Sequence, residues 1–355
     1  MWEISLDALD ASKSSHVLRI ERRVVTSAVC LKSAKPPKPE RRYVSIPIAT
    51  LDPTYCHELD LYQQFGEQED HRLFRGRDFP LSDDDLEKLR ARGVTRLFIR
   101  AGEQRAYQSY LRENLSNFVE DESLPATQRF QILNQVTQDC LQETFERGDV
   151  SETVEASRDM GRHTVNLMNR TDLVAQDVFS MIKHDFHTFT HSANVCSYSV
   201  LLAKGLGIVA PAQLEEIATG ALLHDVGKTG IPYELLTKPG GLSDDERELI
   251  RSHPTVGFAR LCRREKLTWG QLMMVYQHHE RMDGKGYPVG VKGDEIHPWG
   301  QLCAIVDVFD ALTSDRPYHR GQHITEVLSY LERESGRGLD SEMVKCWTSI
   351  MSRNC

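Results

Sequence analysis

The sequence has no stretch that is both apolar and long enough to cross a bilayer, which takes about 20 residues. We therefore expect no membrane partner. Disulfide-type cysteine spacing is also missing: the eight cysteines are scattered, and none forms a Cys-x-x-Cys pair. This pattern favours reduced thiols, buried as small hydrophobic residues, over a disulfide framework. The sequence thus predicts a cytoplasmic protein.

Positive charge is in short supply. The 355 residues include 43 Lys and Arg against 52 Asp and Glu, which gives a net charge of -9. Proteins bind duplex nucleic acid mainly through cations that neutralise its phosphates, so this balance argues against a duplex nucleic acid partner. An anionic ligand would need a local group of cations or metal ions to overcome the field of the whole chain.

Histidine is the residue type that the sequence concentrates. Ten of the fourteen histidines lie between His184 and His323. Any one of them has an ordinary explanation as a surface residue, but imidazole is also a common ligand of transition metals. Histidines gathered in one half of a chain indicate a metal site in that half.

The first half of the chain divides into three segments by composition. Residues 1–40 end in a run of lysine and proline that cannot pack into a core, so we expect a flexible N-terminal segment. Residues 41–106 combine short strand patterns with one helix, which predicts a small α+β module for regulation or dimerisation. Residues 107–171 have helical spacing and predict a helical connector. A homodimer could form through the module or through the connector.

From residue 172 to residue 355 the pattern is almost entirely helical. Helices are expected over residues 177–204, from Pro211 to the His224-Asp225 pair, from Ser243 towards His253, over residues 269–280 and over residues 298–313. Ser243 and Glu246 form a capping box at the start of the third helix. This half predicts a helical bundle with ligands that project inward. The expected fold class is mainly α, with a small N-terminal α+β domain.

Seven side chains of this half lie on or at the ends of five successive predicted helices. They are His191, His224, Asp225, His253, His278, His279 and Asp307. Imidazole and carboxylate suit iron, manganese, nickel or zinc. A carboxylate can bridge two ions, and seven ligands exceed the needs of one ion, so two ions are favoured. Each residue alone has a structural explanation, such as a helix cap; their joint occurrence carries the prediction.

These residues fall within ordered motifs that resemble the HD-GYP family of HD-domain metal-dependent phosphohydrolases. The motifs are His191-Ser192-x-Asn194-Val195, His224-Asp225-Val226-Gly227-Lys228, the single His253, His278-His279-Glu280-x-x-Asp283-Gly284-x-Gly286-Tyr287-Pro288 and Asp307-Val308-Phe309-Asp310-Ala311-Leu312-Thr313-x-Asp315-Arg316-Pro317-Tyr318. The resemblance covers residues 172–345. A bare His-Asp pair is weak evidence, but the full ordered set is highly specific.

The resemblance implies an HD-type helical bundle that hydrolyses cyclic di-GMP to pGpG, and in many members to GMP, through a hydroxide that bridges metal ions. It implies that the ions are bound by His224, Asp225, His253, His278, His279 and Asp307, with Asp225 as the bridge. His191 would complete one ion's shell or help to hold a third ion. Iron or manganese is the expected metal, with nickel or zinc as alternatives.

The resemblance also assigns residues to the substrate. Lys228 and Arg316 are expected to hold the phosphate, and Lys228 to assist the leaving group. Gly286 and Tyr287 are expected to line the guanine or ribose side. The structural alternatives are a surface charge for Lys228, and for Arg316 an ion pair with a neighbouring aspartate. Asp310, one helical turn from Asp307, is expected to support the site rather than to bind metal.

Two positions depart from the family pattern. Members with three metals have a glutamate four residues before the first histidine, where this sequence has His187, so a binuclear site is favoured. His319 stands where the family often has lysine. Other functions stay open: hydrolysis of another cyclic dinucleotide or of a nucleotide monoester, binding of cyclic di-GMP without catalysis, and oxygen activation by a di-iron site.

Overall fold

The structure is a computed structural model, which describes residues 43–53, 59–65, 70–79, 81–170, 173, 175–182, 188–238, 240–263, 266–315 and 320–352. Its contacts divide these residues into two compact units. The smaller unit contains the described residues of 35–140 and of 166–182, and the larger unit contains those of 141–165 and of 183–355. The domain limits predicted from the sequence stay predictions.

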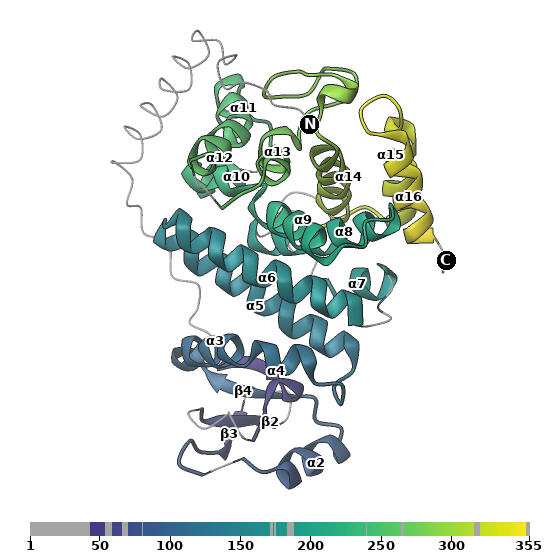
Figure 1. The fold of residues 1–355 in the computed structure, drawn as a ribbon. Helices are drawn as coiled ribbons and strands as arrows, with labels where there is room; N and C mark the ends of the chain where they lie inside the picture. Colours follow the sequence, from purple (N-terminus) through teal and green to yellow (C-terminus); the bar gives the residue numbers. More distant parts are fainter. Residues whose placement is uncertain are drawn as a thin grey trace. The chain divides into compact units, whose positions relative to one another are not determined.

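A four-stranded antiparallel sheet forms the centre of the smaller unit (Figure 1). Its strands are β1 (Tyr43–Pro47), β2 (Leu61–Phe65), β3 (Asp70–Arg75) and β4 (Arg96–Arg100), in the order β1-β4-β2-β3. β1 and β4 pair from Tyr43 opposite Arg100 to Pro47 opposite Arg96. Leu97 and Ile99 are buried at alternate positions of β4, so one face of this central strand carries a core.

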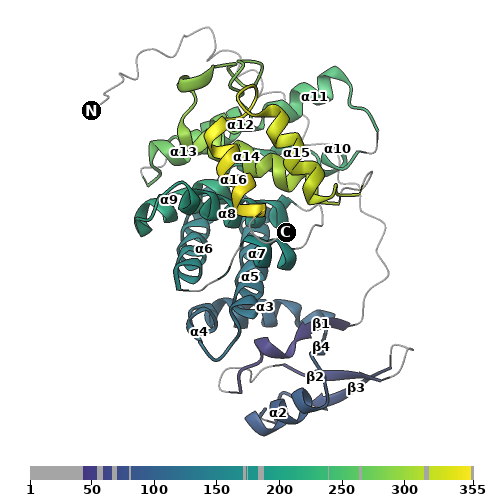
Figure 2. The same cartoon turned by 90° about the vertical axis from the view of Figure 1, so that its right-hand side faces the viewer.

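α3 (Gln104–Glu113) and α4 (Leu115–Glu120) lie on one side of this sheet, and α2 (Asp83–Ala91) lies on the other (Figures 1 and 2). The smaller unit also contains α7 (Ala175–Met181) and the 3-10 turns η2 (Ile48–Thr50) and η3 (Ala101–Glu103). α2 begins with a capping box formed by Ser82 and Asp85, and it is followed by Gly93, which has a φ of 73°. The Tyr110 hydroxyl donates to the carbonyl of Thr50 at 2.9 Å and ties α3 to η2.

A helical bundle makes up the larger unit (Figure 2). Its elements are α8 (Thr188–Gly205), α9 (Pro211–Leu223), η4 (Val226–Gly230), α10 (Tyr233–Leu236), α11 (Asp244–Arg251), α12 (His253–Leu261), α13 (Trp269–Gln277), η5 (Gly293–Glu295), α14 (Pro298–Thr313), α15 (Ile324–Glu334) and α16 (Ser341–Ser352). The helices α5 (Ala126–Arg147) and α6 (Val150–Arg170) contribute residues to both units. The chain is mainly α with a small N-terminal sheet, so the predicted fold class is confirmed.

Three aromatic rings hold the helices of the bundle together. Tyr198 on α8, Phe309 on α14 and Trp347 on α16 are fully buried. Their ring centroids are 5.1–5.4 Å apart, and each pair meets edge to face. Such pairs add about 0.5–1.5 kcal/mol each to the free energy of burial. The trio fixes α8 against α14, and these two helices carry candidate ligands.

Several helix boundaries follow signals in the sequence, and one prediction fails. α14 begins at Pro298 and ends at Thr313 as predicted, and α11 begins with the predicted capping box. The single helix expected over residues 177–204 is wrong, because α7 ends at Met181, Ile182 forms a bend and α8 begins at Thr188. No glycine or proline marks this interruption, so composition gave no warning of it. Within the described ranges, no helix has the length and apolar character of a membrane span.

Candidate metal centre

The seven candidate ligands come together in the larger unit. His191 lies on α8, His224 caps α9 and Asp225 follows it, His253 opens α12, His278 caps α13 and His279 follows it, and Asp307 lies on α14. Six of them form two groups in which the ligand atoms lie within 4.8 Å of one another. We call His191, His224 and Asp225 the aspartate group, and His253, His278 and His279 the histidine group.

The Asp225 carboxylate lies between the two groups. Its Oδ2 is 3.4 Å from His224 Nε2 and 3.7 Å from His191 Nε2, in the aspartate group. Its Oδ1 is 3.2 Å from His253 Nε2 and 3.8 Å from His278 Nε2, in the histidine group. One oxygen therefore faces each group, which is the arrangement that a carboxylate needs in order to bridge two ions.

The Asp307 carboxylate also reaches both groups. Its Oδ1 is 3.0 Å from His191 Nε2 and 4.0 Å from His224 Nε2. Its Oδ2 is 3.8 Å from His279 Nδ1. Two carboxylates thus lie between the imidazoles of α8, α9, α12 and α13. Asp307 itself belongs to a fifth helix, α14.

Backbone carbonyl groups orient three of the imidazoles. The Nδ1 atoms of His224, His253 and His278 lie 2.7, 2.8 and 2.9 Å from carbonyl oxygens of the preceding helical turn. A histidine that donates through Nδ1 to a carbonyl keeps the lone pair of Nε2 for a cation. The ends of α9, α11 and α13 therefore direct three Nε2 atoms toward the Asp225 carboxylate.

A carboxylate orients His191 instead. His191 Nδ1 donates to Asp310 Oδ2 at 2.7 Å, and Asn194 Nδ2 donates to Asp310 Oδ1 at 2.9 Å. Asp310 and Asn194 are buried. Asp310 therefore lies behind His191 and supports it, which agrees with the supporting role predicted from its spacing to Asp307.

Burial sets the protonation of the histidine group. It lowers the pKa of His253 and of His278, and it lowers the pKa of His279 to about 3. Neighbouring imidazoles add to this lowering for His278 and His279, since their positive charges would repel. Near neutral pH these three side chains are uncharged, and the neutral imidazole is the form that binds metal.

Opposite charges set the protonation of the two carboxylates. Burial by itself would raise their pKa values. Lys228 and the adjacent imidazoles nevertheless hold the pKa of Asp225 well below its usual range, and the hydrogen bond from His191 does the same for Asp307. The same contacts affect His191. Burial lowers its pKa, but the hydrogen bonds to Asp307 and Asp310 outweigh burial and raise the pKa to about 10. Both carboxylates are therefore ionised and able to attract cations.

The residues fit a divalent metal. His224 Nε2 and Asp225 Oδ1 are buried and have no hydrogen-bond partner in the part of the chain that the structure describes. Leaving such an atom unsatisfied costs about 1–3 kcal/mol, and coordination to a cation would remove this cost. Calcium and magnesium prefer oxygen ligands, whereas a mixture of imidazole and carboxylate suits transition metals.

Two glycines let the His224-Asp225 pair approach α12 closely. A Cβ atom at Gly227 would lie 1.9 Å from the carbonyl oxygen of His253, and a Cβ atom at Gly257 would lie 3.2 Å from the backbone nitrogen of Gly227. Any larger residue at Gly227 would collide with backbone, which cannot move aside easily. The close contact between η4 and the start of α12 brings Asp225 next to His253.

The loop after His279 folds back on the histidine group. A Cβ atom at Gly286 would lie 2.5 Å from the carbonyl oxygen of His279, and the Tyr287 N–H donates to that oxygen at 3.1 Å. The Tyr287 ring stacks on the His279 imidazole, with centroids 4.6 Å apart and planes 27° apart. Burial raises the pKa of Tyr287. Gly286 thus acts through its backbone, because it makes room for this turn.

Glu280 is a site residue that sequence reasoning did not assign. Its carboxylate is buried and accepts hydrogen bonds from the N–H groups of Val289 at 2.7 Å and Gly290 at 3.0 Å. It therefore fixes the far end of the loop that carries Tyr287. The sequence shows a carboxylate directly after two histidines, which could have drawn attention to Glu280. Its role was not predictable, because its hydrogen-bond partners lie nine and ten residues away along an irregular loop.

The predicted substrate residues are placed only in part. Lys228 Nζ donates to Asp225 Oδ2 at 2.5 Å, on the side of the aspartate group. Gly286 and Tyr287 lie beside the histidine group. Arg316 and His187 lie outside the described residues. The structure therefore brings together all seven predicted ligands, Lys228 and the Gly286-Tyr287 turn.

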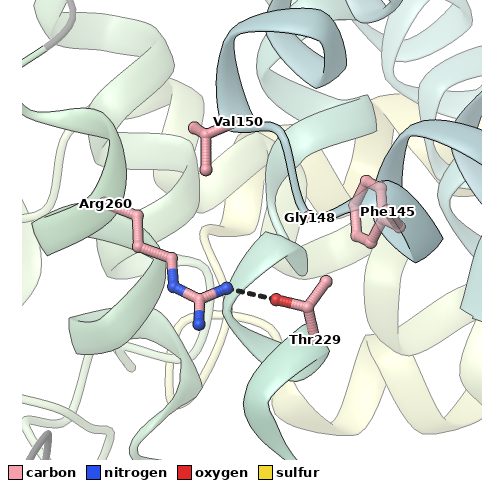
Figure 3. A pocket seen from close by; sticks show the side chains of 5 residues that line it. All are labelled: Phe145, Gly148, Val150, Thr229 and Arg260. Carbon is pink, nitrogen blue, oxygen red and sulfur yellow. Dashed lines mark hydrogen bonds between the residues drawn. The ribbon is translucent and has the colours of Figure 1, made fainter.

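A cavity of about 510 Å³ lies beside η4 and contains none of the candidate ligands. Figure 3 shows its lining residues, which are Phe145, Gly148, Val150, Thr229 and Arg260. Arg260 donates to the Thr229 hydroxyl, and this hydroxyl donates to the carbonyl of Val226 at 2.9 Å. The polar wall of the cavity thus joins α12 to the turn that carries Lys228.

Comparison with known proteins relates this part of the chain to phosphodiesterases. Residues 179–343 match the family model of the HD domain. A cyclic di-GMP phosphodiesterase of Pseudomonas aeruginosa is 33% identical over 185 residues, which cover 48% of this chain and 44% of that protein. A cyclic di-GMP phosphodiesterase of Thermotoga maritima is 37% identical over 168 residues, or 47% of this chain and 45% of that protein.

A relative with another substrate is similar to the same extent. A 3′3′-cGAMP-specific phosphodiesterase of Vibrio cholerae is 39% identical over 160 residues, which cover 44% of this chain and 36% of that protein. The chain spans less than half the length of each of these three relatives.

A solved structure shares the fold. The HDG"Y"P protein Bd1817 of Bdellovibrio bacteriovorus is similar with a TM-score of 0.62 and 22% sequence identity, over 87% of this chain and 99% of that one. Together with the family match, this likeness confirms the HD-type bundle predicted from the motifs.

Proposed function

We propose that this chain, whose residues 179–343 match the family model of the HD domain, is a metal-dependent phosphodiesterase of the HD-GYP type that hydrolyses cyclic di-GMP to pGpG, with GMP as the product of any second cleavage. One observation carries the proposal: the two oxygens of Asp225 face two separate groups of imidazoles. The names of two relatives support cyclic di-GMP as the substrate.

The aspartate group would hold one ion and the histidine group the other, with Asp225 and Asp307 shared between them. Two divalent ions in such a site supply an activated water for in-line attack at phosphorus and neutralise the charge that develops on the phosphate. Iron or manganese is proposed from the family resemblance, with nickel or zinc as alternatives, because imidazole and carboxylate ligands suit all four metals. A third ion would involve His187 and is not part of this proposal.

Lys228 would hold the phosphate. Its ammonium group is half-buried and lies 2.5 Å from Asp225 Oδ2, so it is close enough to donate to a phosphate oxygen at the aspartate group. A fixed cation at this place would also protonate, or stabilise, the leaving 3′ oxygen. Arg316 is proposed as a second phosphate ligand on the basis of the sequence motif, and Tyr287 as an aromatic surface for the guanine or ribose.

A second cyclic dinucleotide is the alternative substrate. The relative from Vibrio cholerae is named for 3′3′-cGAMP, which differs from cyclic di-GMP in one base. A site that recognises the phosphates and sugars through Lys228 and metal ions would accept both compounds. Relative kcat/KM values therefore decide between them.

The test is hydrolysis by protein that has been purified anaerobically and analysed for metal. We expect about two divalent ions per chain, conversion of cyclic di-GMP to pGpG, loss of activity with a chelator, and recovery with Mn²⁺ or Fe²⁺. The same assay with 3′3′-cGAMP ranks the two substrates. Metal-loaded protein that binds cyclic di-GMP and leaves it intact would instead indicate a receptor.

Lys228→Met tests the role of the ammonium group separately from the metal. We expect kcat to fall about 100-fold, the effect of removing one preorganised donor to developing charge, while metal content stays at the wild-type value. Lys238→Met is the matched control, because Lys238 pairs with Glu246 at 2.6 Å on another part of the surface. Loss of metal in Lys228→Met would mean that Lys228 serves only to hold Asp225.

We propose a cytoplasmic homodimer that forms through the N-terminal module or the helical connector. Five cysteines among the described residues are free thiols, as expected for a reducing compartment. Light scattering of the full chain, and of a variant that lacks residues 1–105, would show whether the module holds two copies together.

A further inference from the structure

Arg251 lies close to the histidine group and is separated from it by one aromatic ring. It is the last residue of α11, two positions before His253. Its guanidinium carbon lies 5.3 Å from the centroid of the Tyr287 ring. The same ring stacks on the His279 imidazole at 4.6 Å.

The position of Arg251 relative to the candidate ligands is set from two directions. The end of α11 is attached to His253, because His253 Nδ1 lies 2.8 Å from the carbonyl oxygen of Ile250. The Tyr287 backbone is attached to His279 through a 3.1 Å hydrogen bond. A side chain that rests on the Tyr287 ring is therefore held at a defined place beside the site.

The charge of Arg251 is free for a ligand. Arg251 is exposed, and among the described residues it makes no ion pair. Its only recorded partner there is the Tyr287 ring. Arg281, on the same loop as Tyr287, shows the contrast: it is paired with Asp283 at 3.0 Å and with Glu334 at 2.8 Å. In a chain with a net charge of -9, this unpaired guanidinium is a local cation of the kind that an anionic ligand needs.

We propose that Arg251 binds the second phosphodiester of a cyclic dinucleotide, the one that is not being cut. This inference rests on the proposed function. The ring of such a substrate carries two phosphodiesters, and when one is placed among the metal ligands the other projects beyond them. A guanidinium binds two phosphate oxygens through its planar fork while its face rests on an aromatic ring.

This role differs from those of Lys228 and the metal ligands. The second phosphodiester undergoes no bond change, so contact with it contributes equally to the bound substrate and to the transition state. Such uniform binding lowers KM and leaves kcat unchanged. A substrate with a single phosphodiester gains nothing from Arg251. The contribution of Arg251 therefore appears as a preference for cyclic dinucleotides over simple diesters.

The experiment compares Arg251→Met on two substrates, with metal-loaded full-length protein. We expect KM for cyclic di-GMP to rise about tenfold, the usual effect of one charge-assisted contact, with kcat and metal content close to the wild-type values. The ratio of kcat/KM for cyclic di-GMP to that for bis(p-nitrophenyl) phosphate should fall by the same factor. Arg251→Lys keeps the charge without the fork, and its ratio should lie between the two.

Arg247→Met is the matched control. Arg247 is exposed on the same helix, one turn earlier, and its recorded hydrogen bond goes to the carbonyl of Leu242 at 3.3 Å. We expect its substrate ratio to equal that of the wild type. An equal fall in Arg247→Met would reduce the effect to general surface charge and would overturn the inference.

The remaining outcomes separate the inference from the proposed function. Arg251 has no such role if Arg251→Met leaves KM unchanged, or if both substrates lose activity alike. If wild-type protein binds cyclic di-GMP without cutting it, the proposed activity is wrong. The role of Arg251 is then tested by the Kd for cyclic di-GMP, which should rise in Arg251→Met and would stay unchanged if the inference is wrong. If wild-type protein hydrolyses bis(p-nitrophenyl) phosphate and does not bind cyclic di-GMP, the metal chemistry stands while the substrate and the role of Arg251 are both wrong.

Discussion

The aspartate group and the histidine group are built by different means. In the histidine group, carbonyl oxygens of adjacent helix ends orient His253 and His278. In the aspartate group, a carbonyl oxygen orients His224 in the same way, but the buried carboxylate of Asp310, in the last turn of α14, orients His191. The histidine group thus depends on where helices end, whereas the orientation of His191 depends on a single side chain.

This difference affects how each group responds to substitution. A backbone carbonyl cannot be removed by mutation, so the orientation of the histidine group survives most changes around it. The orientation of His191 depends on Asp310, and a carboxylate behind a metal-binding histidine also makes the imidazole a stronger ligand. The two groups should therefore be separable by mutation, except at Asp225 and Asp307, whose carboxylates reach both.

Asp225→Asn should have the largest effect, because Asp225 lies within 3.4 Å of an imidazole in each group, whereas Asp307 is 3.8 Å from His279 in the histidine group. Asparagine keeps the shape but loses the charge and one of the two acceptor oxygens. We expect both ions to bind more weakly and activity to fall about 1,000-fold or more. Metal analysis and cyclic di-GMP hydrolysis measure the two effects. Asp245→Asn, an exposed substitution on α11, is the control.

If the Asp225→Asn protein retained two ions and its activity, the two groups would be independent sites and the bridging proposal would be wrong. A folded variant is needed for that conclusion, and thermal unfolding followed by circular dichroism provides the check.

Asp310→Asn should separate the groups. The variant keeps one acceptor oxygen, which cannot serve both His191 and Asn194 as the carboxylate does. We expect the affinity of the aspartate group for its ion to fall about 10–100-fold, while the histidine group keeps its ion. Calorimetric titration of metal-free protein with Mn²⁺ measures both events. Asp294→Asn, an exposed change on η5, controls for the lost charge.

Equal weakening of both binding events in Asp310→Asn would contradict the separation, because it would show that His191 and the histidine group are coupled through Asp307. An unchanged titration would show that Asn194 and the helix backbone are enough to orient His191.

Sequence reasoning selected candidate ligands that the structure brings together, because each motif combines residue type with order along the chain. The limits of α14 were also readable, since Pro298 is favoured in the first turn of a helix. The supporting role of Asp310 followed from its one-turn spacing to Asp307. These features are local in sequence, so the residues themselves carry the information.

Other features depend on contacts between distant segments and were not predictable. The interruption between α7 and α8 has no glycine or proline signal. Glu280 finds its partners on a loop without regular spacing. The contact between Arg251 and Tyr287 joins residues from α11 and from the loop after α13. Packing decides which side chains meet across such distances. The residue pattern of one segment therefore cannot predict these contacts.

Arg260→Met should have the smallest effect and tests whether the two groups are joined outside the ligands. Arg260 lies on α12, the helix that begins with His253, and it donates to Thr229 on the turn that follows Asp225. Losing this hydrogen bond removes about 1 kcal/mol of support for the turn that carries Lys228. We therefore expect kcat to fall up to about fivefold, with metal content and KM unchanged.

Arg263→Met removes an exposed arginine just beyond the same helix and serves as the control. If Arg260→Met behaved like this control, the hydrogen bond to Thr229 would have no part in placing Lys228. If it instead released the ion of one group, the wall of the cavity would belong to the metal centre itself. If kcat falls while both ions are retained, only the position of Lys228 has changed. That result would show that Arg260 links α12 to η4 and so helps to place Lys228.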